Sequence, residues 1–138
     1  MTDSPASEDG FGDFEPQLLA FTLERGIPVA MFEVSVLTDD ENLEQLEREM
    51  NILHDQFEHR FIVLDLSVVQ FATSSLLARF IKLHRKLHRE GGRLALCNLS
   101  EMMQEILLAS RLDEYFTVGA DREAAVAELL AIKQAEVN

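Results

Sequence analysis

Residues 61–76, FIVLDLSVVQFATSSL, decide the fold that the sequence predicts. The first four, FIVL, form an uninterrupted apolar run, which is typical of a strand covered on both faces in a largely parallel sheet. Asp65 and Ser67 end this run. The rest of the chain is consistent with helices and strands that pack around this central strand.

Three consecutive hydroxyl side chains, Thr73, Ser74 and Ser75, follow the central strand. Leucine and phenylalanine then recur at helical intervals, which predicts a helix from about Ser74 to Arg89. The first backbone N–H groups of a helix are unpaired and carry partial positive charge, so a hydroxyl there can cap the helix. The same place favours a phosphate group. Ser74 is therefore interpreted either as a plain N-cap or as a phosphate-bearing residue.

Two strands and a helix are predicted before the central strand. Residues 17–24 and 27–35 have strand character and flank an Arg-Gly pair, which is a tight-turn signal. Thr38 and Glu41 have the spacing of a capping box, and a helical apolar stripe follows them. We expect the acids that lie off this stripe to face solvent: Glu44, Glu47 and Glu49.

Four further elements are predicted after the helix that begins near Ser74. Residues 93–97 form a strand, Ser100 caps a helix, residues 115–118 form a last strand, and Asp121 opens a last helix. The order is ββαβαβαβα. This alternation predicts a single α/β domain with a mainly parallel sheet, right-handed crossovers and an N-terminal hairpin.

Length and charge limit the classes of protein that fit. The 138 residues suit one domain, which we expect at 17–134, after an acidic flexible tail at 1–16 and before a short end at 135–138. The net charge is −13, and fifteen acids stand against two bases in residues 1–58. Such a balance argues against nucleic-acid binding, which requires that phosphates be neutralised.

The sequence predicts neither membrane insertion nor a disulfide. The longest apolar runs are about five residues, far short of the ~20 that cross a bilayer, and the N-terminus lacks the layout of a secretory signal. Cys97 is the single cysteine and lies in an apolar strand pattern. We therefore expect a buried thiol in a reducing compartment, which indicates a cytoplasmic protein.

The patterns that would indicate catalysis or a cofactor are incomplete. Asp39, Asp40 and Asp65 invite comparison with a phosphoacceptor receiver domain, but only one helix separates them and the expected lysine is missing. His84 and His88 share a helix face, yet no third ligand supports a metal site. No nucleophile–histidine–acid set and no glycine-rich phosphate loop is visible. We predict no catalytic residues, no metal site and no cofactor.

The helix that begins near Ser74 carries more positive charge than any other stretch. Its basic residues are Arg79, Lys82, Arg85, Lys86 and Arg89. They indicate either a solvated face with long side-chain stems, or a contact face for an acidic partner or for the acidic tail. The sequence leaves both interpretations open.

The chain resembles the STAS family, which is named for sulfate transporters and anti-sigma-factor antagonists. The resemblance runs from about Gln17 to Leu130 and is most specific in FIVLDLSVVQFATSSLLARFIKLHRKLHREGGRLALCNLS. In that family a buried strand that ends in Asp-Leu-Ser leads to Asp-Ser-Ser/Thr-Gly-Leu at a helix start. Thr73 stands where the family usually has Asp, and Leu76 where it usually has Gly. The LDEYF stretch at 112–116 resembles the usual entry to the last strand.

This resemblance implies a non-enzymatic regulatory module. Ser74 falls on the serine that a partner kinase phosphorylates in antagonist members, with Thr73 and Ser75 as additional acceptors. The implied partner is an anti-sigma factor or a related protein kinase, bound through Thr73, Ser74, Ser75, Leu76 and Arg79. A STAS subunit of a scaffold or larger complex, without a phospho-switch, is the alternative, and pairing of two copies of the chain also stays open.

Overall fold

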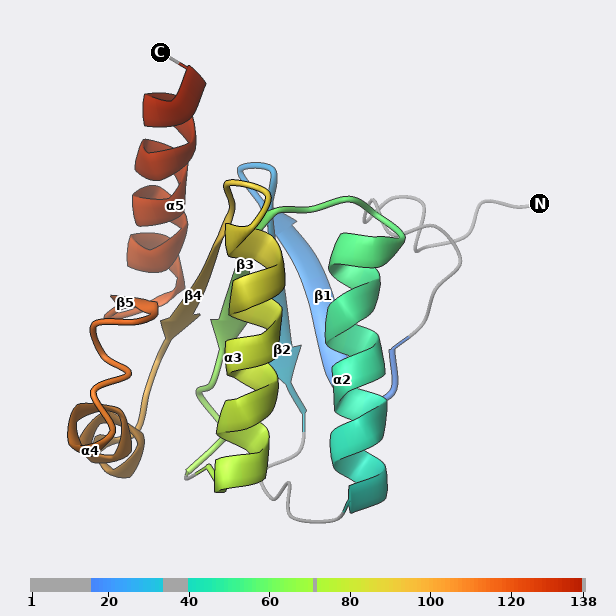
Figure 1. Cartoon of the computed structure of the whole chain (residues 1–138), viewed down its shortest axis with the longest axis vertical. Helices are drawn as coiled ribbons and strands as arrows, with labels where there is room; N and C mark the ends of the chain where they lie inside the picture. Colours follow the sequence, from blue (N-terminus) through green and yellow to red (C-terminus); the bar gives the residue numbers. More distant parts are fainter. Residues whose placement is uncertain (1–15, 34–39, 71, 138) are drawn as a thin grey trace.

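The computed structural model describes residues 16–33, 40–70 and 72–137, which form a sheet with helices on both faces (Figure 1). The strands are β1 (Leu19–Glu24), β2 (Ile27–Phe32), β3 (Phe61–Asp65), β4 (Arg93–Cys97) and β5 (Thr117–Gly119). The helices are α2 (Asp40–Asp55), α3 (Ser74–His88), α4 (Glu101–Ala109) and α5 (Arg122–Val137). Their order along the chain is the predicted one.

The five strands lie in the sheet in chain order, β1-β2-β3-β4-β5. β1 and β2 form an antiparallel hairpin, and every later neighbour is parallel. The predicted α/β class, with its mainly parallel sheet and N-terminal hairpin, is therefore confirmed. β3 is the central strand, as the apolar run indicated.

Each face of the sheet has its own hydrophobic core, and β3 contributes to both. Ile62 and Leu64 pack with the helices α2, α3 and α4. Phe61 and Val63 lie in a second cluster with apolar side chains of α5. Figure 1 shows α2 and α3 side by side across one face. All four side chains are almost fully buried, which explains why the run contains no polar residue.

Two glycines end α3 and lead into β4. Gly91 has φ +82°, a left-handed conformation that glycine adopts without strain. At Gly92 an added Cβ would lie 1.9 Å from the carbonyl oxygen of Arg60. A side chain there would force apart the starts of β3 and β4, which pair Phe61 with Arg93.

Three predicted strand boundaries differ from the structure. The first strand begins at Leu19 rather than at residue 17. The last strand is Thr117–Gly119 rather than residues 115–118, because the N–H groups of Tyr115 and Phe116 donate back to Leu112 in a turn. The second strand ends at Phe32, before residue 35. The acidic tail up to residue 15 and Thr38 lie outside the described residues, and the side chain of Glu41 is not described. The predicted capping box therefore lies outside the described part of the chain.

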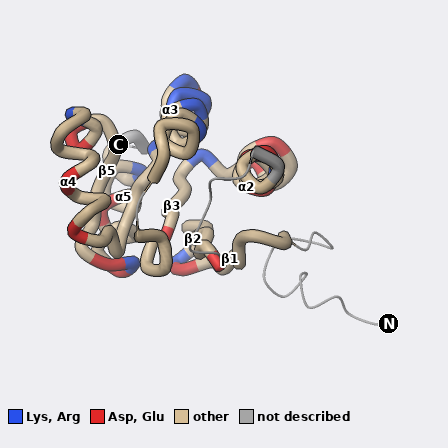
Figure 2. The backbone as a smooth tube through the Cα atoms, turned by 90° about the horizontal axis from the view of Figure 1, so that it is seen from below, with Lys and Arg blue, Asp and Glu red and all other residues tan. Residues whose placement is uncertain are grey.

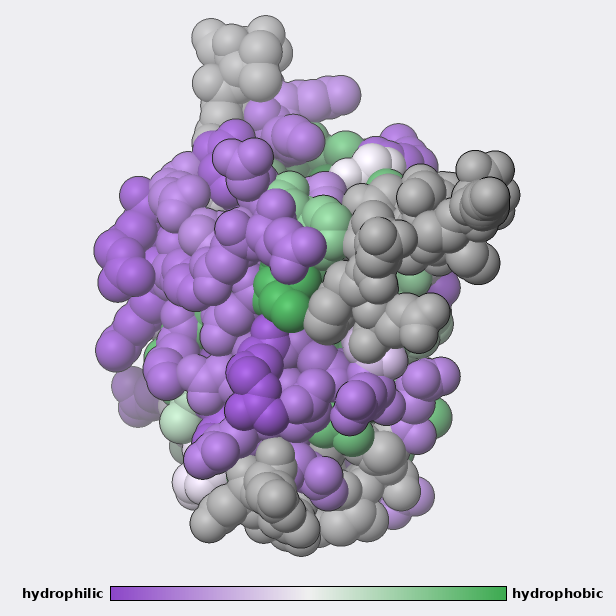
Figure 3. Space-filling view, turned by 90° about the vertical axis from the view of Figure 1, so that its right-hand side faces the viewer, coloured by the Kyte–Doolittle hydropathy of each residue, from purple (hydrophilic) through white to green (hydrophobic). Residues whose placement is uncertain are grey.

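The expectation that Glu49 faces solvent is wrong. Its side chain is fully buried beneath the start of β1, although the visible surface on the α2 side is mostly hydrophilic (Figure 3). The carboxylate accepts backbone N–H groups of Gln17, Leu18 and Leu19 at 2.9–3.1 Å. It also accepts Nε2 of Gln45 at 2.8 Å. Glu49 therefore fastens the first described residues to α2.

Cys97 is fully buried, as predicted. Burial, with the nearby negative charge of Asp65, raises the pKa of its thiol to about 12, so the thiol stays protonated near neutral pH. Among the described helices none is long and apolar enough to span a membrane.

Candidate functional site

The loop between β3 and α3 begins at a buried carboxylate, that of Asp65. One of its oxygens accepts the N–H of Ser67 at 3.1 Å and Nδ2 of Asn98 at 3.0 Å. The other accepts a guanidinium N–H of Arg122 at 2.8 Å. Arg122 in turn pairs with Glu24 at 3.1 Å. Asp65 thus joins the ends of β3 and β4 to the start of α5.

The surroundings of Asp65 favour its ionised form. Burial by itself raises the pKa of the carboxyl, but hydrogen bonds from Asn98, Arg122 and Ser67 outweigh burial and hold the pKa below its usual range. Because both oxygens are already occupied by donors, the carboxylate serves this network. Its oxygens are thus engaged by donors of the protein.

A second hydrogen bond holds the same loop against α4. Ser100 Oγ donates to the carbonyl oxygen of Gln70 at 2.7 Å and accepts the N–H of Met103 at 3.1 Å. Ser100 therefore caps α4, as predicted, and also anchors the loop that leads to α3. That loop is fixed at Ser67 and again at Gln70, shortly before the hydroxyl residues.

Thr73, and not Ser74, is the N-cap of α3. Thr73 has extended backbone angles (φ −79°, ψ 166°), and its Oγ1 accepts the N–H of Leu76 at 3.2 Å. The helix begins at Ser74, whose side chain is exposed together with that of Ser75. The interpretation of Ser74 as a plain N-cap is thus wrong, since the preceding residue already performs that role.

The first turn of α3 is a favourable place for a negative charge. It contains no acidic residue, and the partial positive charge of the helix N-terminus attracts anions. Arg79 lies one turn further on and donates to the carbonyl oxygen of Ser75 at 3.2 Å. It also pairs with Glu47 of α2 at 3.3 Å.

Leu76, which was expected among the partner-binding residues, is buried. Only 1% of it is exposed, and it packs in the core beneath α3 with Leu77 and Phe80. The position is occupied by an apolar side chain that turns inward, so the exposed part of this site consists of Ser74 and Ser75, with Thr73 half-buried.

Figure 2 shows basic residues gathered along α3. Several of their side chains form contacts within the fold. Lys82 pairs with Glu47 at 2.7 Å. Lys86 pairs with Asp55 at 2.9 Å and donates to Asn51 at 3.1 Å. Glu47 is therefore not simply solvated, as the sequence had indicated, but bridges α2 to α3. These contacts lower the charge that α3 can offer to an acidic partner.

Two residues that organise the site, Asn98 and Arg122, were not recognised in the sequence. Ser100 was recognised as a helix cap, but its hydrogen bond to Gln70 was not. Asn98 carried a weak signal in the sequence, because an asparagine directly after a buried strand favours a turn. In the structure it has φ +56°, a conformation that asparagine adopts more readily than most residues. Arg122 carried none, since its partner Asp65 is 57 residues away.

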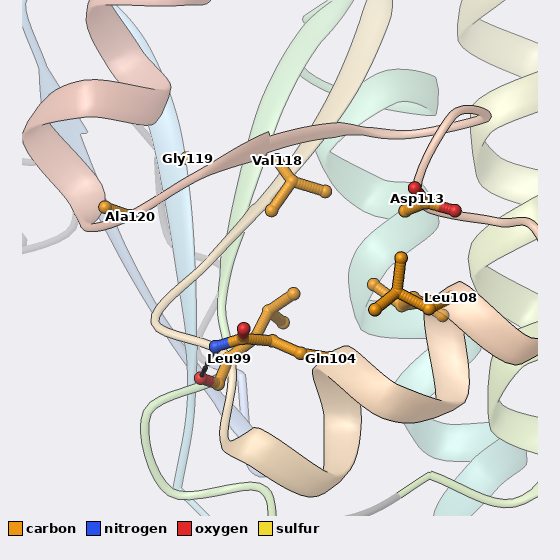
Figure 4. Close-up of a pocket in the computed structure, with 8 residues that line it drawn as sticks. Leu99, Gln104, Leu108, Asp113, Val118, Gly119 and Ala120 are labelled. Carbon is orange, nitrogen blue, oxygen red and sulfur yellow. Dashed lines mark hydrogen bonds between the residues drawn. The ribbon is translucent and has the colours of Figure 1, made fainter.

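The described side chains contain no set of three or more histidine, cysteine or acidic groups placed to hold a metal ion. A cavity of about 360 Å³ lies between α4 and β5 (Figure 4). Leu107, Leu108 and Val118 form much of its wall, and Asp113 is its one titratable side chain. This lining contains no nucleophile–base pair.

Replacing Thr73 with alanine is expected to lower the free energy of unfolding by about 1 kcal/mol, because the N–H of Leu76 loses its partner. Ser74→Ala removes an exposed hydroxyl and should change stability by less than about 0.5 kcal/mol. Urea unfolding of the two variants and the wild type measures both values. Equal losses in the two variants would contradict the assignment of the cap to Thr73.

Comparisons with known proteins agree on one family. A family model described as the STAS domain matches residues 22–125. The chain is 35% identical over 86 residues to the "Putative anti-sigma factor antagonist BtrV" of Bordetella bronchiseptica, which is 62% of this chain and 73% of that protein.

Several solved structures share the fold, including one from Thermotoga maritima and one from Bacillus. A "putative anti-sigma factor antagonist" from Thermotoga maritima has a TM-score of 0.72 at 18% identity, over 80% of this chain and 93% of that one. The Bacillus cell fate determinant SpoIIAA in its phosphorylated form has a TM-score of 0.56 at 24% identity, over 76% of this chain and 96% of that one. At these identities the two structures support the fold alone.

Proposed function

This chain belongs to the STAS domain family, and on that premise we propose that it is a non-enzymatic regulatory protein that binds an anti-sigma factor or a related kinase. The binding surface is centred on the exposed N-terminus of α3, with Ser74 and Ser75 at its middle. Phosphorylation of Ser74 by the partner controls the complex. The name of the relative in Bordetella bronchiseptica supports this class of partner.

One observation carries the proposal: the hydroxyl of Ser74 has no structural task. Thr73 provides the cap, and the Ser74 side chain is exposed and makes no hydrogen bond within the described part of the chain. Its Oγ can therefore attack the γ-phosphorus of ATP in a partner's active site, with loss of the hydroxyl proton and release of ADP, without unfolding the helix.

The structure supplies a physical reason why phosphorylation would act as a switch. A phosphoryl group adds roughly −1.5 to −2 charges at neutral pH. In the free protein the helix N-terminus stabilises that charge, and no acid in the first turn repels it. In a complex formed around a neutral hydroxyl, the same charge would have to be desolvated, which is costly. Phosphorylation thus favours the free protein.

The other predicted acceptors differ in their access. Ser75 is exposed and lies one turn before Arg79, so it is a second candidate for phosphorylation. Thr73 is half-buried and its Oγ1 is engaged with Leu76, so its modification would remove the cap of α3. We therefore rank Ser74 first, Ser75 second and Thr73 last.

Ser74→Asp is expected to weaken binding to the partner captured from the native cell by roughly a hundredfold, because an uncompensated carboxylate enters the interface. Its stability should equal or slightly exceed that of the wild type, since the helix dipole favours an acid there. Calorimetric titration and urea unfolding measure the two quantities.

Two controls accompany Ser74→Asp. Ser74→Ala should bind within about twofold of the wild type, because it removes only a hydroxyl. Ala124→Asp places the same charge in the exposed first turn of α5 and should leave affinity unchanged. If Ser74→Asp binds as tightly as the wild type, the alternative of a complex subunit without a phospho-switch is favoured. Mass spectrometry after incubation with the partner and ATP then tests for phosphorylation itself.

A further inference from the structure

A second cavity, of about 590 Å³, lies between the C-terminal half of α3 and the segment that precedes β5. Its volume is typical of sites that bind small organic molecules. Tyr115, Phe116 and Thr117 form part of its lining. The remaining residues carry a charge or an imidazole ring. These residues are His84, Arg85, His88, Arg89, Arg93 and Glu114.

The surroundings of the two histidines of this cavity favour a proton on Nε2 of each neutral ring. Their rings stack with centroids 5.6 Å apart. A guanidinium N–H of Arg93 donates to Nδ1 of His88 at 3.0 Å, and because arginine cannot accept, the proton of neutral His88 lies on Nε2. In His84, Nδ1 is buried with no partner in the described structure. An unpaired buried N–H is unfavourable, so the proton of His84 also belongs on Nε2.

Two arginines of the cavity, Arg85 and Arg89, make fewer contacts within the fold than the other basic residues of α3. Arg85 and Arg89 are exposed, and their side chains make no hydrogen bond or ion pair within the described residues. In contrast, Lys82 and Lys86 are paired with acids of α2. Glu114 is the one carboxylate of the lining. The cavity therefore presents an excess of donors and of positive charge.

Balancing the helix dipole does not explain this cluster. Basic side chains in a last turn offset the partial negative charge of a helix C-terminus, which accounts for Arg85 and His88. It does not account for Arg93, which reaches the cavity from β4, or for the wall that Tyr115 provides. The Tyr115 ring lies 4.5 Å from that of His84. Charge and aromatic surface thus converge from three separate segments.

We propose that this cavity binds a small doubly charged anion of the phosphate class, most favourably a phosphate monoester with an apolar or aromatic organic part. The arginines and the two imidazole Nε2–H groups contact the anionic oxygens, because charge-assisted donors are the strongest partners of phosphate. Tyr115 provides the wall for the organic part. Ser74 lies about 15 Å away along the axis of α3, so this site is distinct from the proposed phosphorylation site.

Binding is expected to strengthen as the pH falls. Burial, the charge of His88 and the charge of Arg93 lower the pKa of His84, so its ring is neutral at neutral pH. A bound dianion stabilises the protonated ring and raises that pKa. The other titratable or charged groups that face the cavity are Arg85, His88, Arg89, Arg93, Glu114 and Tyr115.

The test is a titration of the full chain with sulfate, inorganic phosphate and phenyl phosphate at about pH 6 and about pH 8. Sulfate keeps its double charge across this range, so tighter sulfate binding at the lower pH reports titration of the protein. We expect one saturable site, with phenyl phosphate bound more tightly than inorganic phosphate. The ring signals of His84 in NMR spectra should show a higher pKa with sulfate than without.

The double variant Arg85→Gln with Arg89→Gln should weaken binding of all three anions by about tenfold or more. Lys82→Gln removes one charge on the side of α3 that faces α2. Its affinity for each anion should stay within about twofold of that of the wild type. Absence of saturable binding would overturn the proposal, as would an equal loss in Lys82→Gln. Binding of phenyl phosphate no tighter than that of inorganic phosphate would restrict the site to the free inorganic anion.

Discussion

Replacing Asp65 with alanine is expected to lower the free energy of unfolding by about 3 kcal/mol, because the change leaves three partly buried hydrogen bonds without their acceptor. The carboxylate is 4% exposed and accepts from Ser67, Asn98 and Arg122. Arg122 keeps its contact with Glu24 and is 30% exposed, which moderates the loss. Ser67 is exposed and Asn98 is partly exposed, so water can replace part of their lost hydrogen bonds as well.

Asp65→Asn, which keeps the shape and removes the charge, should cost less than alanine. Asp113→Asn is the matched control, because Asp113 is exposed and its side chain makes no hydrogen bond in the described structure. Urea unfolding should show a lower midpoint with an unchanged slope for the Asp65 variants alone. A change in Asp65→Ala no larger than that in Asp113→Asn would show that the network does not stabilise the fold.

The contribution of Asp65 should also depend on pH in a defined direction. Its pKa in the folded state is held below the ordinary value, so the stabilisation is fully present above the pKa of the unfolded chain, about 3.9. It is lost as the pH falls through the lower folded-state pKa. The stabilities of the wild type and Asp65→Asn should therefore converge in acid. A constant difference between them would contradict this account.

Glu49→Ala is the second large effect, with an expected loss of about 3 kcal/mol. The substitution leaves the N–H groups of Gln17, Leu18 and Leu19 without their shared acceptor. It also leaves a cavity where a fully buried side chain had packed. We expect the start of β1 to detach from α2, while β3 and β4 keep their pairing.

Amide hydrogen exchange distinguishes this local effect from general destabilisation. In Glu49→Ala the N–H groups of residues 17–19 should exchange much faster, whereas those of Ile62 and Leu64 should follow only the global loss. Glu44→Ala is the control on the same helix, since Glu44 is exposed. Unchanged exchange at residues 17–19 would mean that Glu49 does not hold them.

Local patterns were sufficient to predict most of the fold. The run FIVL required apolar cover on both faces, and β3 indeed contributes to a core on each side of the sheet. Ser100 and Asp121 cap α4 and α5, with Oγ and Oδ1 accepting N–H groups three residues later. Such signals depend on residues that are close in the chain, so they can be recognised from the sequence alone.

The candidate site was predicted less completely, because its details depend on backbone angles and on how α3 packs against the sheet. The hydroxyl cluster correctly marked the start of α3, but which hydroxyl caps the helix depends on backbone angles that place Thr73 outside the helix and Ser74 inside it. Leu76 was included among the partner-binding residues by resemblance. Its position on the inner side of α3 follows from where that helix packs on the sheet.

The sequence by itself determined the α/β class, the order of the elements, the central strand and the helix start that presents Ser74 and Ser75, because hydrophobic period and capping act over a few residues. Only the tertiary structure decided the partners of charged groups. It brought Asp65 to Arg122, Glu49 to Leu19 and Glu47 to Lys82, pairs separated by 30 to 57 positions. It also brought Arg93 and Tyr115 to the two histidines of α3. The identity of a charged residue does not reveal whether its side chain is solvated or buried. Its partner is therefore defined only when the chain has folded.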